Sequence, residues 1–420
     1  FSYFFSSRPT GRAIYAIGNN PEAARVSGVN LARTILIVYS LTGLLVGFAG
    51  LIYVARTGIV QTNTGSGFEL EVIAAVMLGG TSVFGGKGTV IGSLLGAILV
   101  GIVASIIISC IDYKDYRTLG IFFYIITTGL LVYVLFAGTG EQYGSRSWID
   151  LGFITFQPAD LAKITYILLA SVFLERIYDE QNNKRANILK FLIYSAIPIG
   201  LIILQKDFGT ALVFIFIFFV LVFICGIAYK YLVIMVTAFL LTTPLIWFFA
   251  LNDARRKRIF VFLNPELDPL GAGYNVIRSK MAIGSGQIYG KGLFKGIQTQ
   301  NRSVPVSESD FIFSVVGEEL GFIGAIIVIL LICIILLRCI YIARKARDSY
   351  GMFVAIGIAA MWAFHAMENI GMSVGVLPVT GIPLPFVSSG GSYMLTSYLA
   401  VGIVLSISMR RKKEIFNSSD

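Results

Sequence analysis

The sequence predicts an all-α fold, a polytopic transmembrane helix bundle of about ten to eleven membrane segments with a large outward loop at 252–310. Hydrophobic residues make up 56% of the 420 residues and charged residues only 13%, and the mean hydropathy is +0.81. Several windows hold ~20 mostly apolar residues, enough to cross a bilayer as a helix. Basic clusters recur at alternate ends of these windows, as the positive-inside rule expects.

The net charge of +10 fits an inner-membrane protein with basic cytoplasmic loops and does not indicate a nucleic-acid partner. No secretory signal peptide is visible, and Phe1 is not an initiator methionine, so we expect a truncated N-terminus. No pair of cysteines has metal-ligand spacing, which predicts packing roles for all four: Cys110, Cys225, Cys333 and Cys339.

The polar stretch 8–33 predicts a short surface helix. Pro21 lies near its start, Glu22 in its first turn, and Gly28 ends it. One interpretation is an ordinary connecting loop; the other is a docking helix for a cytoplasmic partner.

The apolar windows follow in order. A first crossing is expected at 33–56, and 68–80 is short enough to re-enter the membrane rather than cross it. The remaining crossings are predicted at 89–110, 118–137, 158–173, 188–204, 210–229, 232–251, 311–342, 351–376 and 393–407.

Basic clusters set the orientation of these crossings. They are expected in the cytoplasm, together with the C-terminus, and the loop 252–310 then faces outward. A basic loop that faces outward suggests an anionic extracellular ligand. The clusters are Lys114/Arg117, Lys184/Arg185/Lys190, Arg338/Arg344/Lys345/Arg347 and Arg410/Arg411/Lys412/Lys413.

The loop 252–310 holds nine basic and five acidic residues, and its glycines favour a shaped loop over one long helix. It ends at Asp310, a carboxylate at the boundary with the next apolar window and the best single candidate for chemistry. The alternative is that Asp310 caps the helix that follows.

Other polar residues gather on the same predicted outer side. Ionisable groups so close to a membrane usually face a bundle interior or a water-filled cavity. For Lys163 and Arg146 the alternative is snorkelling to the interface. The loop 378–392 is rich in proline and glycine, which prevents a simple helix. The lone histidine, His365, is predicted to pack in the core. For Glu318 and Glu319, pairing with basic groups is as good an interpretation as catalysis.

The first segment resembles the C-terminal part of permease subunits from ribose-type sugar ABC importers, up to about residue 103. The matching stretches are Gly11–Asn20, Glu22–Arg25, Ile73–Ser82 and Gly85–Gly92. This resemblance implies that the surface helix docks on an ATPase subunit. The N-terminal half of such a permease and its last helix are absent. The implied docking residues are Asn20, Glu22, Ala23, Ala24 and Arg25.

From about 109 to 415 the chain resembles the RodA/FtsW/SpoVE (SEDS) family of peptidoglycan glycosyltransferases, and within it the RodA branch. The motifs are Arg146-Ser147-Trp148, Gln157-Pro158, Gln205 with Asp207–Thr210, Ser279–Gly286, Gly290–Gly292, Asp310–Phe313, Glu318–Gly321, Asn369–Met372 and Leu377–Gly391. The chain departs from the family pattern at Ala159-Asp160, at Lys206, and in lacking the family's first two helices.

The family resemblance implies polymerisation of lipid II into glycan strands for cell elongation, at the outer face of the bacterial cytoplasmic membrane. Asp310 would act as general base, directly or through a divalent cation, Mg²⁺ or Mn²⁺. The implied partners are lipid II, the growing glycan strand, membrane lipid and a class B penicillin-binding protein transpeptidase. The implied substrate-binding residues are Arg146, Gln157, Lys163, Gln205, Lys280, Lys291 and Ser388.

We therefore expect two segments, a permease-like fragment at 1–109 and a SEDS glycosyltransferase at 110–420. The alternatives are transport, either of sugar with an ABC ATPase or of a lipid-linked precursor by flipping, and a fusion without activity.

Overall fold

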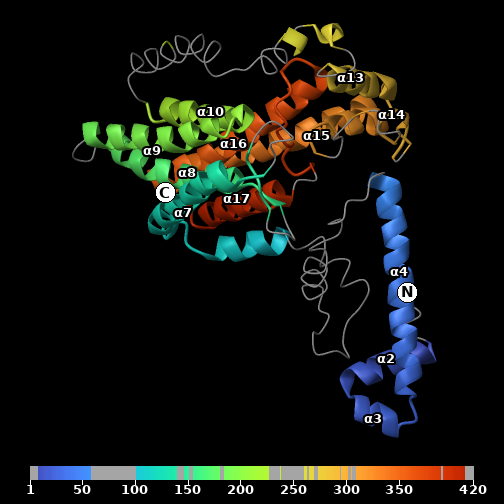
Figure 1. Ribbon diagram of the computed structural model, residues 1–420. Coiled ribbons are helices and arrows are strands. Elements are labelled where there is room, and N and C mark those ends of the chain that lie inside the picture. The colour runs from blue at the N-terminus through green and yellow to red at the C-terminus, as the bar shows by residue number, and fades with distance from the viewer. Residues whose placement is uncertain are drawn as a thin grey trace, which may run out of the picture. The chain divides into compact units, whose positions relative to one another are not determined.

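The computed structural model describes residues 8–57, 101–139, 146–150, 155–179, 184–226, 237, 260–262, 264–268, 273–293, 295–300, 304, 309–388 and 391–411 (Figure 1). The chain divides into two compact units, residues 1–104 with 150–155, and residues 105–149 with 156–420.

In the first unit, α2 (Pro9–Asn19) packs on α3 (Pro21–Val26) and on α4 (Leu31–Thr57). The Asn20 side chain accepts the backbone N–H groups of Glu22 and Ala23, and so caps α3. Gly28, at φ +83°, follows the end of this helix. The predicted surface helix is confirmed, and α4 coincides with the first predicted crossing.

The second unit contains the remaining helices, preceded by an apolar helix over Gly101–Cys110 that begins in the first unit. A two-stranded sheet comes before the second of these helices in the chain. In chain order the elements are α7 (Tyr116–Ala137), β1 (Ile149–Asp150), β2 (Thr155–Phe156), α8 (Pro158–Tyr178), α9 (Lys184–Leu204), α10 (Phe208–Ile224), η3 (Pro265–Leu267), α13 (Tyr274–Gly286), α14 (Ile297–Gln300), α15 (Ile312–Arg344), α16 (Ser349–Val374) and α17 (Gly391–Met409).

Within the described residues, six helices are long and apolar enough to cross a membrane, and Gly101–Cys110 and Phe208–Ile224 are shorter apolar helices. The predicted all-α class is confirmed, because β1 and β2 of two residues each are the only named strands in this part of the chain. The predicted segments 68–80 and 232–251 lie outside the described residues, except for Thr237.

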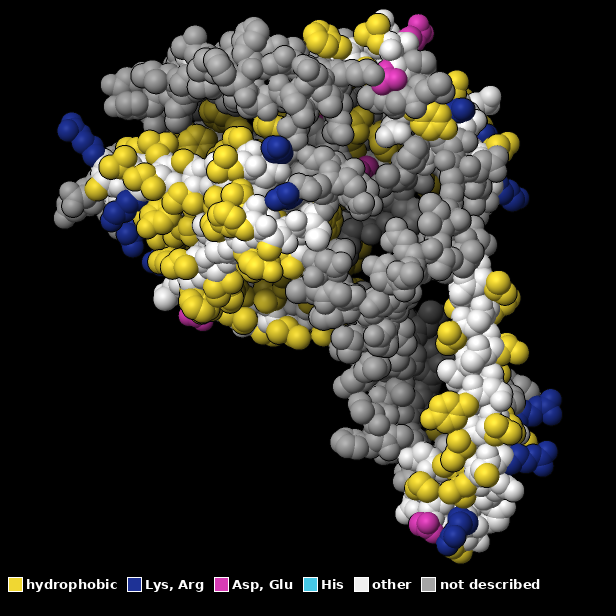
Figure 2. Space-filling view, in the orientation of Figure 1, with side chains coloured by type: hydrophobic (Ala, Val, Ile, Leu, Met, Phe, Trp, Pro, Cys, Tyr) yellow, Lys and Arg dark blue, Asp and Glu magenta, His cyan; other side chains and the backbone are white. Residues whose placement is uncertain are grey.

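Helices α8 and α16 form the centre of the second unit. Nearly all side chains of α8 are buried, and α16 contacts α8, α10, α13, α15 and α17 (Figure 1). The helices around them turn large apolar side chains outward, and those of α7 and α9 form a broad yellow area in Figure 2. Such a surface suits hydrocarbon, where exposed apolar side chains carry no hydration cost.

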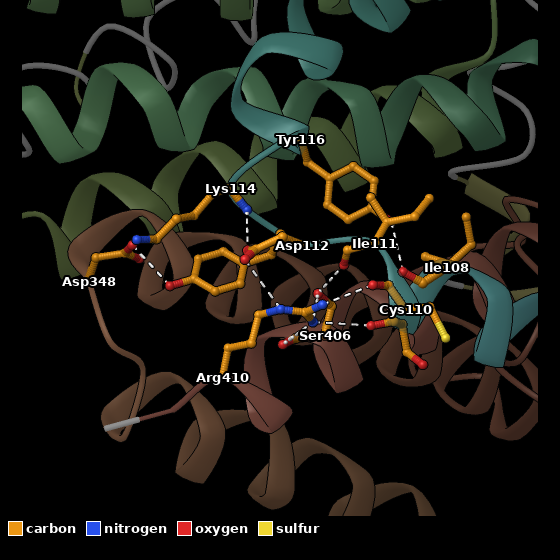
Figure 3. Close-up of polar contacts among 11 residues, drawn as sticks. Ile108, Cys110, Ile111, Asp112, Lys114, Tyr116, Asp348, Ser406 and Arg410 are labelled. Atoms are coloured by element: carbon orange, nitrogen blue, oxygen red, sulfur yellow. Dashed lines mark hydrogen bonds and ion pairs between the residues drawn. The ribbon is translucent and has the colours of Figure 1, made fainter. Parts of the chain in front are cut away.

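The turn before α7 is tied to the end of α17 (Figure 3). The Arg410 guanidinium donates to the carbonyl of Cys110 at 2.9 Å and pairs with Asp112 at 3.3 Å. Tyr113 donates its hydroxyl hydrogen to Asp348 at 2.9 Å. Burial, together with the Asp348 carboxylate, raises the pKa of Tyr113, so the phenol keeps the proton that makes this bond. The turn is thereby joined to both α16 and α17.

Candidate active site

Asp310 lies in the turn immediately before α15. The N-cap of that helix is Phe311, and no side chain caps it, so the capping alternative for Asp310 is wrong. The Asp310 carboxylate instead accepts a hydrogen bond from the Ser309 hydroxyl at 2.8 Å. Burial raises the pKa of the Asp310 carboxyl above its ordinary value, and the Ser309 bond opposes this shift. The carboxylate is therefore a stronger base than an exposed aspartate.

The loop that follows α16 packs against this carboxylate. Gly381 has φ +74°, and a Cβ placed there would lie 3.2 Å from Asp310 Oδ2. Ser388, which is buried, donates to the Ser309 carbonyl at 2.6 Å and accepts from the Leu384 N–H at 2.7 Å. Ser388, predicted as a substrate-binding residue, thus lies beside Asp310 and supports the backbone on both sides of the contact.

Asn369 at the end of α16 joins the two segments. Its Nδ2 donates to the carbonyls of Asp310 and Ile382, each at 2.8 Å. The sequence singled out Asn369 only as part of a motif, without a role. The neighbouring Glu368 accepts a hydrogen bond from Thr380 at 2.9 Å. An acid next to an amide in the outer half of the predicted crossing 351–376 is the sequence signal that could have indicated this support.

Lys163 does not snorkel to the interface. It is 2% exposed, pairs with Asp160 at 2.8 Å and contacts His365 Nε2 at 3.1 Å. Its ammonium also lies 5.3 Å from the ring centroid of Tyr393. A buried ammonium requires such partners, because a buried charge without a partner destabilises the fold by several kcal/mol, on the order of 3–5 in measured cases. The predicted core placement of His365 is confirmed, and the contact with Lys163 was not foreseen.

Gln157 precedes α8, Gln205 follows α9 and Arg146 precedes β1, and the three residues have different partners. Gln157 Nε2 donates to Asp207 at 3.2 Å, and Asp207 itself caps α10. Gln205 is buried and donates to the Leu131 carbonyl at 2.8 Å. Arg146 is exposed, and its backbone N–H donates to the Gln205 carbonyl at 3.3 Å. A shared substrate cavity for these residues stays a prediction.

The loop lysines have structural partners. Lys291 pairs at 2.9 Å with Glu318, which is fully buried and also accepts the N–H groups of Gln298 and Thr299. The amine end of Lys280 packs against Gly375, where a Cβ would lie 2.6 Å from its Nζ. Gly375 is the C-cap of α16, and an ammonium is favourable at a helix C-terminus. Substrate binding by either lysine stays a prediction.

Asp310 was also the suggested metal ligand. Among the described residues, no group of three or more His, Cys, Asp or Glu side chains could hold a metal ion. Mg²⁺ commonly binds through one or two carboxylates together with substrate phosphates and water. The Asp310 carboxylate, which accepts only the Ser309 hydroxyl among the described groups, fits that kind of shared site.

Comparison with known proteins identifies the family. The family model for the cell cycle proteins FtsW, RodA and SpoVE matches residues 59–413. The chain belongs to the FtsW/RodA/SpoVE family. The resemblance to this family was expected to begin at about residue 109, but the match begins earlier, at residue 59.

Individual relatives agree with this membership. The chain is 36% identical over 349 residues to peptidoglycan glycosyltransferase MrdB of Escherichia coli, covering 82% of this chain and 93% of that protein. It is 38% identical over 322 residues to stage V sporulation protein E of Bacillus subtilis, covering 74% and 84%.

Two solved structures have the same fold. A chain from a peptidoglycan synthase complex superposes with a TM-score of 0.61 at 28% identity, covering 83% of this chain and 98% of that one. The rod shape determining protein RodA of Thermus thermophilus superposes with a TM-score of 0.55 at 25% identity, covering 83% and 97%. The chain is therefore an integral membrane protein of this helical architecture.

Proposed function

We propose that the chain polymerises lipid II into peptidoglycan glycan strands at the outer face of the bacterial cytoplasmic membrane, as a RodA-like enzyme of cell elongation. The observation that carries the proposal is Asp310. Its half-buried carboxylate has a raised pKa and is held through the backbone by Asn369 and Ser388, in a chain whose relatives are named peptidoglycan glycosyltransferases.

The reaction needs a base at the acceptor sugar. The acceptor hydroxyl oxygen forms a bond to the anomeric carbon of the donor, the bond from that carbon to the phosphate oxygen breaks, and the lipid diphosphate leaves. Asp310 takes the hydroxyl proton as the new bond forms. A raised pKa suits this step, because the ionised carboxylate binds a proton more readily than that of an exposed aspartate.

Charge develops on the departing diphosphate. Arg146 and Lys163 are proposed to stabilise it, together with the basic residues of the loop 252–310, including Lys280 and Lys291. Lys163 is tied to Asp160, and Lys291 to Glu318, so these two would act through the fields of their ion pairs. Gln157 and Gln205 are proposed to line the same cavity. The Asp310 carboxylate would hold a divalent cation, which would supply positive charge to offset the charge of the departing diphosphate.

The proposed partner is a class B penicillin-binding protein transpeptidase. Support comes from the similar chain that was solved within a peptidoglycan synthase complex described as coordinating polymerization and crosslinking. The C-terminus is proposed to lie in the cytoplasm, since the basic residues Arg410 and Arg411 directly follow α17, the last described helix.

Residues 1–109 are proposed to be a permease-like segment that precedes the glycosyltransferase segment, 110–420. Helix α3 is exposed apart from Ala24, and its Arg25 and Glu22 form a surface ion pair at 3.2 Å. This makes it available for an ABC ATPase. Pull-down of a sugar-importer ATPase with the wild type and with Glu22→Lys would test it, and equal recovery would reject the docking role.

The function itself is tested by glycan synthesis in vitro. Purified protein is incubated with lipid II, a cognate transpeptidase and Mg²⁺ or Mn²⁺, beside Asp310→Ala. We expect glycan chains from the wild type and none above background from the variant. Wild-type protein that is folded, bound to the transpeptidase and still inactive would reject the proposal, as would an active Asp310→Ala.

A further inference from the structure

Three consecutive residues of the loop over Asp310 are each held by a different buried side chain. The Ile382 carbonyl accepts from Asn369 at 2.8 Å, and the Leu384 N–H donates to Ser388 at 2.7 Å. Between them, the Pro383 carbonyl lies 3.1 Å from Nδ1 of His365. His365 and Asn369 are four residues apart, so they lie on one face of α16.

The other nitrogen of the ring faces a buried ion pair. His365 is 1% exposed, and its Nε2 lies 3.1 Å from the Lys163 ammonium, which is paired with Asp160. An ammonium can only donate hydrogen bonds, so Nε2 must accept. In a neutral imidazole the hydrogen then resides on Nδ1, where it donates to the Pro383 carbonyl.

The position of the ring is also fixed by stacking. The ring centroids of His365 and Tyr393 lie 4.3 Å apart with 12° between the ring planes, so Tyr393 of α17 covers one face of the imidazole. The contacts of His365 therefore come from α8, α17 and the loop 378–388, all within the second unit. No described contact joins the imidazole to Asp310 directly.

We propose that His365 is a positioning residue for glycan synthesis. The Asp160–Lys163 pair fixes the tautomer of His365, and the imidazole thereby holds the loop at Pro383 over Asp310. The inference rests on the proposed function. Gly381, which faces Asp310 Oδ2, lies two residues before Pro383. A displacement of ~1 Å in a catalytic group can cost about a hundredfold in rate, so a shift of this loop is enough to slow the reaction.

Two substitutions test the contacts of the two ring nitrogens separately. His365→Asn places an amide N–H near the position of Nδ1 and can still donate to Pro383. His365→Gln places its amide near the position of Nε2 and can still contact Lys163, but not Pro383. We expect His365→Asn to retain kcat within about threefold, and His365→Gln to lose about tenfold or more in kcat with KM within about twofold.

Equal activity of the two variants, or a better Gln than Asn, would overturn the proposal. Thermal midpoints of both variants are measured in parallel. A loss of activity in His365→Gln that only follows a loss of folded protein would make His365 a packing residue and would also overturn it.

A second measurement needs no substrate. The sequence has a single histidine, so ¹⁵N-histidine labelling of a protein purified without a histidine tag reports on His365 alone. We expect a neutral ring with its hydrogen on Nδ1 in the wild type. In the Asp160→Asn/Lys163→Met double variant, which removes both buried charges together, we expect the tautomer ratio to shift.

A wild-type ring with its hydrogen on Nε2, or the same tautomer ratio in the double variant, would overturn the proposal even where glycan synthesis is intact. Conversely, the expected tautomer with no glycan synthesis in any preparation would reject the proposed function and, with it, the positioning role. The two failures are therefore distinguishable.

Discussion

The Asp310 carboxyl is half-buried, and the Ser309 hydroxyl is the one described group that donates to it. Burial disfavours its charged form, so the folded protein binds the Asp310 proton more tightly than the unfolded chain does. Stability then falls as pH rises from the unfolded pKa through the higher folded pKa. The ionised base that the reaction needs is thus a destabilising group, as is common at active sites.

Asp310→Asn should therefore separate stability from activity. The amide carries no charge, so we expect the thermal midpoint at neutral pH to rise above that of the wild type. Glycan synthesis should fall by about a hundredfold to ten-thousandfold, the usual contribution of a general base. Thermal unfolding in detergent and the lipid II assay measure the two effects. An unchanged or lower midpoint with normal folding would contradict the burial argument.

The pH profile should report the same carboxyl. As pH falls through the folded pKa of Asp310, the base becomes protonated, so kcat/KM should fall on an acidic limb above the ordinary range of aspartate. The Ser309 bond lowers this pKa, so Ser309→Ala should move the limb to higher pH. Ser349→Ala is the control, because Ser349 donates to Asp179 instead. An acidic limb that shifts equally in both variants would contradict the assignment of this limb to Asp310.

At the scale of elements, the end of α13 and the first turns of α15 meet backbone to backbone. Gly321 has φ +68° and ψ −165°, a conformation essentially restricted to glycine, and it kinks α15. Across the kink, the N–H of Phe322 donates to the Gln287 carbonyl at 2.8 Å, and the N–H of Lys291 donates to the Glu318 carbonyl at 3.0 Å. The motifs Gly290–Gly292 and Glu318–Gly321 of the sequence thus form the two sides of one backbone contact.

Two glycines of α13 offer a matched test of this contact. A Cβ at Gly286 would lie 2.0 Å from the Gly317 carbonyl oxygen, whereas a Cβ at Gly284 would meet nothing within 4 Å. We expect Gly286→Ala to destabilise the protein by about 1–3 kcal/mol, because backbone must move to admit the methyl group. Gly284→Ala should be neutral or slightly stabilising. Denaturation of both variants in detergent measures this, and equal midpoints would refute the close approach.

At the scale of the whole chain, orientation follows from charge. The described part of the loop 252–310 is proposed to face outward, and Arg411 the cytoplasm. Tyr289 is 83% exposed in that loop, so Tyr289→Cys should react with a membrane-impermeant maleimide in intact cells. Arg411→Cys should react only after permeabilisation. The parent protein supplies the background from the native cysteines, and the reverse labelling pattern would invert the topology.

The sequence predicted those features that depend on neighbouring residues alone. The span limits of α4, α7, α8 and α16, and the start of α3 at Pro21, agree with the expected segments within a few residues at most boundaries. Apolar length sets a crossing, and a cap needs only the next turn of the chain. The sequence likewise showed that polar residues gather near the outer ends of the predicted crossings, but it did not show their partners.

Only the tertiary structure decided which polar groups meet. Lys163 and His365 are 202 residues apart, and Asn369 reaches the carbonyl of Asp310 across 59. Which faces of α8, α16 and α17 turn toward each other depends on the packing of the whole bundle, because side chains buried in it must satisfy their hydrogen bonds with whatever the neighbouring helix presents. The sequence by itself therefore determined a membrane bundle with Asp310 as its candidate base. The fold decided that Lys163 is buried, that Lys291 is paired, and that the loop 378–388 lies over the carboxylate.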